Sequence, residues 1–396
     1  MRDVFIVDAV RTPIGRFGGS LKDHSAVDLA AHVMKASLER SGVAPENLDL
    51  FIFGNILRAG QGQLIPRQAA FKAGIPDTVD GFAVDMVCSS GMLSVMQAAT
   101  MIKAGEADLL LSGGTESMSG TGFYLSHRAR WGYKFLMGNP EGVTDLLLHD
   151  GLSDPFSGEA MGVQTERLAS ERGITRDQLD EVAAMSHQRA EAAWAAGAFD
   201  AEVAPIAYRL KREMVDLVQD EGIRAGTTSE SLGALRPAFD KDGVLTAGNS
   251  SQISDGASAL MVASEDAVKK YGLKPLARVM ASSWAAGEPW RFPEAPIPAV
   301  EGVLKKTGLS IGDFDLFENN EAFSINSVLF RDMLGVSYDQ LNVHGGAIAL
   351  GHPIGCSGAR IMTTLIHAMH RRDAQRGMAA ICHGTGGGTA IALERV

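Results

Sequence analysis

The chain has 396 residues, of which 45% are hydrophobic and 21% are charged, a composition typical of a folded protein with more than one packed unit. Its formal net charge of −11 disfavours nucleic acid and anionic membranes as partners, and its three cysteines, an odd number, exclude a disulfide framework. The first residues resemble neither a signal peptide nor a transit sequence, and no apolar stretch is long enough for membrane insertion. We therefore expect a cytoplasmic protein.

The first 120 residues alternate strand-like and helical patterns, which predicts an α/β fold with β-α-β order and a parallel sheet. Strand-like runs fall at residues 4–7, 50–53, 82–87 and 108–111. The segment 90–103 has almost no polar face, so we expect a buried central helix there.

An internal repeat relates the two ends of the chain. The pattern Leu-x-x-Ser-Gly at residues 38–42 recurs as Leu-x-x-Thr-Gly at 304–308, displaced by 266 residues. Cys-Ser-Ser-Gly at 88–91 has a counterpart in Gly-Cys-Ser-Gly at 355–358, displaced by 267. The repeat predicts two similar α/β halves packed against each other.

The segment from about 121 to 246 differs in character and looks inserted between the halves. It is rich in Arg, Glu, Asp and Ala, with a helical stretch at 176–196. Basic side chains gather near its end, at Arg209, Lys211, Arg212 and Arg224. They form the best local anion patch in an acidic chain, although a solvated helix face is an equally good interpretation.

Cys88 is the first residue with a chemical interpretation. It lies between a strand-like run and the central helix, so its thiol would sit at a helix N-terminus. There the helix dipole and free amides lower a thiol pKa and favour a nucleophilic thiolate. A structural cysteine is the alternative.

Three further residues lie beside glycines or at predicted strand ends, where ligand sites of α/β sheets gather. His352 lies in a glycine-rich loop, Cys382 ends an apolar run before a glycine-rich turn, and Asn320 follows a strand expected at 314–317. The alternatives are ordinary surface for His352, a core position for Cys382, and the N-cap of a helix at 321–334 for Asn320.

Motifs of other chemistries are absent or incomplete. His367 and His370 lack the spacing and the Glu of a zinc helix, and no cysteine pair has zinc spacing. Neither a phosphate-binding loop nor a correctly placed dinucleotide fingerprint occurs. We expect no bound metal and no resident cofactor.

Four motifs together resemble those of the thiolase family, and the similarity covers essentially the whole chain. They are Cys88-Ser-Ser-Gly, Asn320-Glu-Ala-Phe, Gly351-His-Pro-Ile-Gly and Cys382-His-Gly. The resemblance implies an α/β fold of two similar β-α-β-α-β-α-β-β halves, arranged in five layers as α-β-α-β-α, with an inserted loop domain.

The same resemblance divides the chain and implies an activity. The first half would comprise residues 1–120 and about 247–268, the CoA-binding loop domain 121–246, and the second half 269–396. The implied activity is acyl-CoA:acetyl-CoA C-acyltransfer: reversible Claisen condensation of acetyl-CoA, or thiolysis of a 3-oxoacyl-CoA, with short chains such as acetoacetyl-CoA expected. The implied partners are acetyl-CoA, acyl-CoA and free CoA, and the implied assembly is a homodimer or homotetramer.

Carried over by motif, the resemblance assigns five catalytic residues. Cys88 would accept the acyl group, His352 would take its proton, and Cys382 would move the proton of the α-carbon. His352 and a water held by Asn320 would stabilise the enolate oxygen, while the backbone amides of Cys88 and Gly384 would hold the acyl-enzyme oxygen. Two thiols divide the work because a carbon acid needs a base near its own path and a thioester needs a soft nucleophile.

Four further positions match substrate contacts of the family. Arg224 would contact the nucleotide end of CoA and Ser251 the pantetheine arm. Met161 and Phe323 would line the acyl pocket, although plain core packing is a common role for such side chains.

The sequence also departs from the family pattern. His383 and Thr385 intrude where the last motif often shows an aliphatic residue and glycines, and a histidine beside the proposed base could alter its pKa. His344 replaces a frequent Asn, Ala160 stands where several short-chain members carry His, and Cys356 occupies a small-residue position. These departures bear on the preferred acyl length more than on the reaction.

Three other functions fit part of the pattern. A Cys-His-Asn thioester hydrolase would use Cys88, His352 and Asn320 but would not need Cys382. A decarboxylating enzyme of the ketoacyl synthase type would act on malonyl thioesters. A non-catalytic acyl-CoA-binding protein would leave Cys88 unreactive.

Overall fold

The structure, a computed structural model, describes residues 2–132 and 142–396, and its core is a mixed sheet of ten strands. The strands are β1 (Val4–Arg11), β2 (Gly15–Arg16), β3 (Leu50–Gly54), β4 (Asp80–Val84), β5 (Leu109–Ser117), β10 (Ser254–Ser264), β11 (Ala277–Ala286), β12 (Leu316–Asn319), β13 (Arg376–His383) and β14 (Gly387–Arg395). Their order is β12-β13-β14-β11-β1-β10-β5-β3-β4, with β2 paired to β10.

The expected parallel sheet is present only in part. β3 pairs in parallel with β4 and β5, and β12 with β13, whereas the other pairs are antiparallel. β13 and β14 are joined by a turn too short to hold a crossover helix, so they must run in opposite directions.

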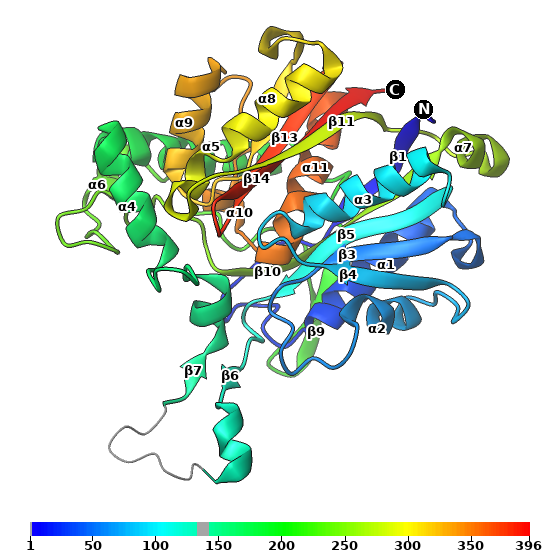
Figure 1. Ribbon diagram of the computed structural model, residues 1–396, viewed down its shortest axis with the longest axis horizontal. Coiled ribbons are helices and arrows are strands. Elements are labelled where there is room, and N and C mark those ends of the chain that lie inside the picture. Colours follow the sequence, from blue (N-terminus) through cyan, green and yellow to red (C-terminus); the bar gives the residue numbers. More distant parts are fainter. Residues whose placement is uncertain (1, 133–141) are drawn as a thin grey trace.

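Helices and strands alternate in layers (Figure 1). The central layer holds α3 (Ser90–Ala104) and α11 (Ile354–Arg371), which pack on each other and on strands of both halves. α1 (Ala26–Ser41) and α2 (Ile65–Lys72) cover the outer face of the first half. α8 (Pro296–Thr307) and α9 (Ser324–Leu334) cover that of the second half.

The remaining elements lie mostly between β5 and β10 and add no strand to the large sheet in the described residues. They are β6 (Phe123–Tyr124), β7 (Thr144–Asp145), α4 (Met161–Arg172), α5 (Arg176–Ala195), β8 (Ile206–Leu210), β9 (Glu213–Leu217) and α6 (Ser229–Gly233), with α7 (Glu265–Tyr271) and α10 (Ala347–Leu350) later in the chain. Over residues 2–132 and 142–396, no helix is both long and apolar enough to cross a membrane.

The central helix expected at 90–103 is confirmed as α3, whereas two predicted strands are displaced. The chain leaves the sheet after Val84 rather than continuing to 87. Ser310 and Asp313 cap a single turn of 3-10 helix, which moves the strand expected at 314–317 to β12. α9 begins at Ser324, so Asn320 is not its N-cap.

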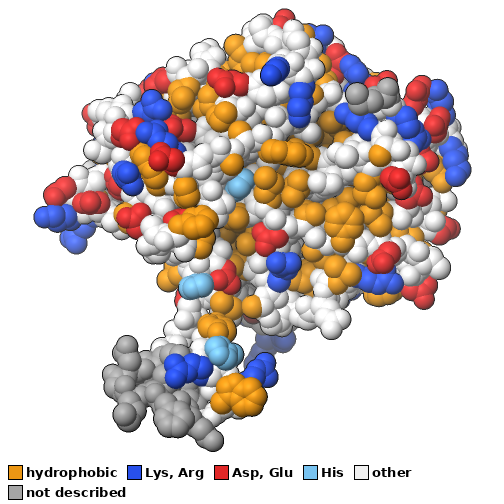
Figure 2. All heavy atoms as spheres, in the orientation of Figure 1, with side chains coloured by type: hydrophobic (Ala, Val, Ile, Leu, Met, Phe, Trp, Pro, Cys, Tyr) orange, Lys and Arg blue, Asp and Glu red, His pale blue; other side chains and the backbone are white. Residues whose placement is uncertain are grey.

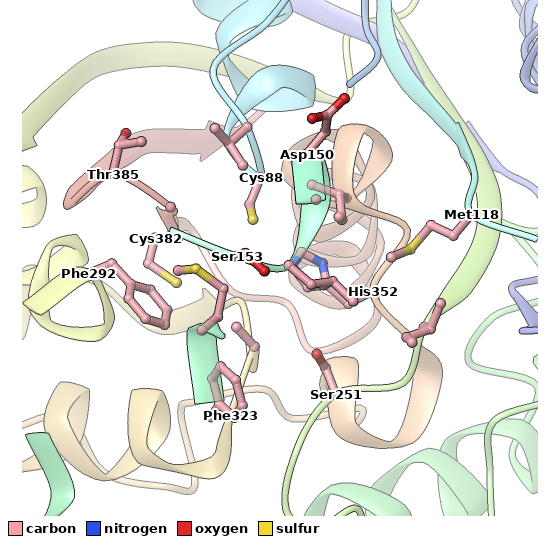
Figure 3. A pocket seen from close by; sticks show the side chains of 18 of the residues that line it. Cys88, Met118, Asp150, Ser153, Ser251, Phe292, Phe323, His352, Cys382 and Thr385 are labelled. Carbon is pink, nitrogen blue, oxygen red and sulfur yellow. The ribbon is translucent and has the colours of Figure 1, made fainter. Parts of the chain in front are cut away.

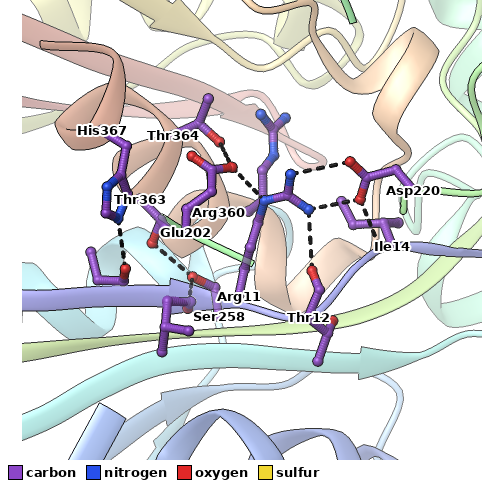
Figure 4. A network of polar contacts seen from close by, with 12 residues as sticks. Arg11, Thr12, Ile14, Glu202, Asp220, Ser258, Arg360, Thr363, Thr364 and His367 are labelled. Atoms are coloured by element: carbon purple, nitrogen blue, oxygen red, sulfur yellow. Dashed lines mark hydrogen bonds and ion pairs between the residues drawn. The ribbon is translucent and has the colours of Figure 1, made fainter. Parts of the chain in front are cut away.

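A buried ionic network fastens the inserted segment to β1 and α11 (Figure 4). The Arg11 guanidinium lies 2.6 Å from a Glu202 oxygen and 2.7 Å from an Asp220 oxygen, and all three side chains are fully buried. Thr364 of α11 donates to Glu202 (3.1 Å), and Trp194 of α5 donates to Asp220 (3.1 Å). Opposite charges therefore compensate one another where no water reaches.

Candidate active site

Cys88 lies in a tight turn between β4 and α3. Val87, directly before it, adopts a left-handed backbone conformation with φ of 48°. The Ser90 hydroxyl fastens the turn, because it accepts a hydrogen bond from the Met86 N–H (2.8 Å) and donates one to the Val87 carbonyl (2.6 Å). A β-branched residue rarely adopts this conformation, so the turn is strained next to the thiol.

A cavity of about 310 Å³ opens beside this turn. In Figure 3 the sulfur atoms of Cys88 and Cys382 and the imidazole of His352 face the same space. The residues singled out from the sequence that line it are Cys88, His352, Cys382, Gly384, Ser251, Met161, Phe323 and Thr385. Side chains from distant parts of the chain therefore meet at one site.

Cys88 is half-buried as a residue, and the pKa of its thiol is raised rather than lowered. Burial raises the pKa of Cys88 to about 12, and the Glu116 carboxyl acts in the same direction. The backbone N–H groups of Gly384 and of Cys88 itself reach the sulfur and oppose this rise. The prediction of a lowered pKa is wrong, because the loss of water around the sulfur outweighs these amides. The thiol therefore needs a base to become a nucleophile.

His352 is a neutral imidazole with one nitrogen available. Burial lowers the pKa of His352 to about 3, and the Arg360 cation contributes. Its Nδ1 lies 2.5 Å from the Ser357 hydroxyl oxygen, whose single hydrogen is donated to the Pro353 carbonyl (2.9 Å). Ser357 therefore accepts from Nδ1–H, and Nε2 keeps a free lone pair. Within the described chain Nε2 has no hydrogen-bond partner, so it is free to accept a proton.

Cys382 is buried near the end of β13. Burial raises its pKa, and the Cys88 sulfur acts in the same direction. His383 points to the opposite face of the strand, with Nδ1 2.6 Å from the Gly384 carbonyl oxygen. His383 is not among the groups that shift the pKa of Cys382, so the influence considered from the sequence is not found.

Asn320 lies close to His352 but does not line the cavity. It follows β12 and is fully buried. Its Nδ2 lies 3.5 Å from Nδ1 of His352, and its Oδ1 has no hydrogen-bond partner among residues 2–132 and 142–396. The unpartnered oxygen leaves room in its hydrogen bonding for a water molecule.

Three of the four residues expected to contact CoA or its acyl group line the cavity, namely Ser251, Met161 and Phe323. Arg224 does not. Its side chain is exposed on the loop before α6, and its backbone N–H donates to Nδ1 of His187 (3.2 Å). The guanidinium therefore lies outside the part of the site where the thiols meet.

Neither the basic residues near the end of the 121–246 segment nor a metal site is found at the cavity in the described part of the chain. Arg209, Lys211 and Arg212 are exposed on the β8–β9 hairpin, whose Ile206 and Leu217 pack in the same apolar cluster as α1. None of the three lines the cavity. In residues 2–132 and 142–396 there is also no group of His, Cys, Asp and Glu side chains able to hold a metal ion.

The other departures from the family pattern occupy different settings. Thr385 borders the cavity with a left-handed φ of 71°, which is unusual for a β-branched residue. His344 is buried edge-on against Phe199. Ala160 is exposed directly before α4, and Cys356 is buried in the first turn of α11, away from the cavity wall.

Two residues that hold the site together were missed from the sequence. The Glu116 carboxylate accepts hydrogen bonds from the Asn55 amide (2.8 Å) and from the Gly355 N–H (2.9 Å), and so ties β5 to α11. Ser357 orients His352 as described above. The repeat carried a signal for it, because Ser357 is the counterpart of Ser90, the serine that fastens the Cys88 turn.

Two family models match the chain, one over its first part and one over its second. Residues 4–266 match the model for the N-terminal domain of thiolase, and residues 273–395 match the model for its C-terminal domain. The chain belongs to the thiolase family. The fold implied by the sequence motifs is thereby confirmed.

Individual thiolases match over their full lengths. The chain is 67% identical over 396 residues to an acetyl-CoA acetyltransferase of Synechocystis sp., with 100% of both chains covered. The crystal structure of the Bacillus anthracis acetyl-CoA acetyltransferase matches with a TM-score of 0.96 at 39% identity, covering 100% of this chain and 99% of that one. The Acat5 thiolase from Ascaris suum, solved in complex with coenzyme A, matches with a TM-score of 0.93 at 39% identity, with both chains fully covered.

Proposed function

We propose that this thiolase is an acetyl-CoA C-acetyltransferase, which condenses two acetyl-CoA molecules to acetoacetyl-CoA and free CoA and catalyses the reverse thiolysis. The proposal rests on one observation: two thiols and a neutral imidazole face a single cavity. The Synechocystis relative of that name supports it through similarity over the whole length.

In the first half-reaction, an acetyl group moves from CoA to Cys88. Nε2 of His352 takes the thiol proton while the Cys88 sulfur attacks the thioester carbonyl. The resulting oxyanion accepts hydrogen bonds from the backbone N–H groups of Cys88 and Gly384. His352 returns the Cys88 proton to the departing CoA. Cys382 then passes its own proton to His352, which leaves Cys382 as a thiolate and His352 protonated.

In the second half-reaction, the Cys382 thiolate takes an α-proton from a second acetyl-CoA. The enolate oxygen accepts hydrogen bonds from protonated His352 and from a water held by Asn320. The enolate carbon attacks the acetyl carbonyl, and Cys88 leaves as a thiolate that recovers its proton from His352. Every group thus returns to its starting protonation state.

The second thiol distinguishes this reaction from the alternatives. A Cys-His-Asn hydrolase has no use for Cys382 in the same cavity. We expect acetyl-CoA to be condensed without hydrolysis and malonyl-CoA to give no faster condensation. Faster turnover with malonyl-CoA would favour the decarboxylating enzyme, and release of acetate without acetoacetyl-CoA would favour the hydrolase.

The side chains that line the cavity favour a substrate with a short acyl chain. Phe292 and Phe323 line it, with ring centroids 6.2 Å apart, and Met161 packs in the same cluster. The experiment is a thiolysis panel of 3-oxoacyl-CoA substrates of rising length. We expect the highest kcat/KM with acetoacetyl-CoA, and a maximum at a longer chain would contradict the short-chain assignment.

Residues 121–246 form, in this proposal, the loop domain that carries CoA, with the pantetheine arm near Ser251 and the nucleotide end near Arg224. The exposed Arg224 guanidinium is available to an anionic group. We expect Arg224→Gln to raise the KM for CoA about tenfold with little change in kcat, because a charge-assisted contact is lost. An unchanged KM would remove Arg224 from the CoA site.

The assembly we propose is a homodimer or homotetramer built on the edge strand β4. β4 ends the sheet, and Phe82 on it and Phe71 nearby on α2 are exposed. Figure 2 shows hydrophobic side chains gathered where Figure 1 places β4 and α3. An unpaired apolar edge favours pairing with another strand. Light scattering on wild type and Phe82→Lys tests this, and a monomeric wild type would contradict it.

The compartment we propose is the cytoplasm. Cys88, Cys356 and Cys382 are all free thiols, and the two in the cavity must stay reduced to act as nucleophile and base. Fractionation of cells with antibody detection tests this assignment, and recovery from an oxidising compartment would overturn it.

A further inference from the structure

The side-chain amide of Asn326 lies against the sulfur of Cys382. Asn326 is fully buried in the first turn of α9, and its Nδ2 donates to the Cys382 sulfur at 3.5 Å. Asn326 lies six positions after Asn320, and the sequence motifs assign no role to it. Nothing in the acyl-transfer scheme above uses it.

The orientation of this amide is determined by its other contacts. Its Oδ1 accepts a hydrogen bond from the Phe323 N–H at 2.9 Å, and a backbone N–H is only a donor. The NH₂ group must therefore point away from Phe323, toward the Pro293 carbonyl (3.2 Å) and the Cys382 sulfur. Exchanging the oxygen and nitrogen positions would set the oxygen against that carbonyl and leave the sulfur without a donor.

The surroundings of Cys382 offer little else to stabilise a negative charge. Among the described residues, Asn326 is the one whose side chain donates to this sulfur, and the backbone N–H of Cys382 is the other group that favours the thiolate. Within the described residues no lysine or arginine shifts its pKa, and the positive charge on His352 is present only during turnover. A hydrogen bond to a charged partner is roughly twice as strong as one between neutral groups, so the contact strengthens when the thiol ionises.

We propose that Asn326 is a positioning residue that donates its amide N–H to the Cys382 thiolate and so sets the basicity of this sulfur for α-proton transfer. The proposal rests on the proposed function. The Cys382 proton passes to His352 after CoA has left and is replaced by the α-proton of the second acetyl-CoA, while Asn326 keeps both its hydrogens throughout.

The test compares Asn326→Leu, Asn326→Asp and Asn326→Gln in two assays: release of CoA as Cys88 is acetylated, and exchange of the acetyl-CoA α-protons with deuterium from solvent. We expect Asn326→Leu to acetylate Cys88 within about threefold of wild type but to exchange α-protons at least about tenfold more slowly, because a hydrogen bond to the thiolate is lost. The pH profile of exchange should shift to higher pH.

Asn326→Asp keeps the acceptor for the Phe323 N–H and the side-chain shape, so it tests the lost donor if the Leu variant does not fold. Asn326→Gln keeps the donor and should retain exchange within about threefold of wild type. Exchange at the wild-type rate in the Leu and Asp variants would overturn the proposal, as would equal losses in all three variants with an unshifted pH profile. Failure of wild type itself to exchange α-protons would instead overturn the proposed function.

Discussion

Gly91 of α3 and Gly358 of α11 each face the backbone of the other helix where the two central helices cross. A methyl group on Gly91 would lie 2.7 Å from the amide nitrogen of Ala359, and one on Gly358 would overlap the amide nitrogen of Met92. The two glycines are 267 residues apart, which is the displacement of the internal repeat. The repeat therefore preserves a crossing that admits no side chain and that brings the start of α3, with Cys88, against α11.

Gly358→Ala should destabilise the protein, because the added methyl group meets rigid backbone rather than a flexible side chain. We expect a loss of about 3 kcal/mol in the free energy of unfolding, at the upper end of overpacking costs. Urea unfolding followed by circular dichroism measures it. Gly233→Ala, with nothing within 4 Å of the new methyl group, is the matched control and should stay close to wild type. Equal stability of both variants would show that the crossing tolerates a side chain.

Much of the layered fold could be predicted from periodicity and the repeat. The nearly all-apolar segment at 90–103 could only be a buried helix, and the repeat placed a second one at α11. The mixed sheet could not be predicted in the same way, because the direction of β10 depends on where the chain returns after a long insertion. The start of β12 at Leu316 depends on the capping of the preceding turn by Ser310 and Asp313, which strand patterns do not register.

The candidate site could be predicted in its residues but not in its electrostatics. Cys88, His352 and Cys382 were found from their glycine-rich and strand-end contexts, and they do line one cavity. The predicted direction of the Cys88 pKa shift was wrong, because the burial that raises this pKa comes from elements distant in sequence that pack around the thiol. Asn326 was missed because a polar residue inside an apolar helix pattern carries no sign of which side chain it faces.

Removing the buried charge of Arg11 should lower the free energy of unfolding substantially. Arg11→Met would leave the carboxylates of Glu202 and Asp220 unpaired in the interior. Breaking a buried ion pair on one side typically costs about 3–5 kcal/mol. Guanidinium unfolding measures the effect, and the triple variant with Glu202→Gln and Asp220→Asn should recover much of the loss. A single variant as stable as wild type would contradict the role of this network.

The stability of the fold should depend on pH through His344. Burial lowers the pKa of His344 to about 4, whereas an unfolded histidine takes up its proton near 6.5. Between these values the unfolded chain binds more protons, so the folded state loses stability as the pH falls. In His344→Asn the free energy of unfolding should fall less steeply below pH 6.5, by up to about 1.4 kcal/mol per pH unit. Parallel pH curves for variant and wild type would count against a buried neutral imidazole.

Gly384→Ala should change substrate preference more than stability. Its new methyl group would make ordinary contacts, 3.6 Å from Met161 and 3.7 Å from Val87, so the fold accommodates it. The methyl group also takes space in the cavity, so we expect kcat/KM to fall about tenfold more for a six-carbon 3-oxoacyl-CoA than for acetoacetyl-CoA. Thiolysis rates with the two substrates check this. An equal fall for both would indicate that the methyl group does not reach the acyl chain.

The division of labour between the two thiols is tested most directly by single-turnover labelling of Cys382→Ala with radioactive acetyl-CoA, combined with deuterium exchange at the α-carbon. The account predicts that the variant still forms the acetyl-enzyme on Cys88 but loses both α-proton exchange and condensation. Exchange and condensation at the wild-type rate in the absence of the second sulfur would contradict it.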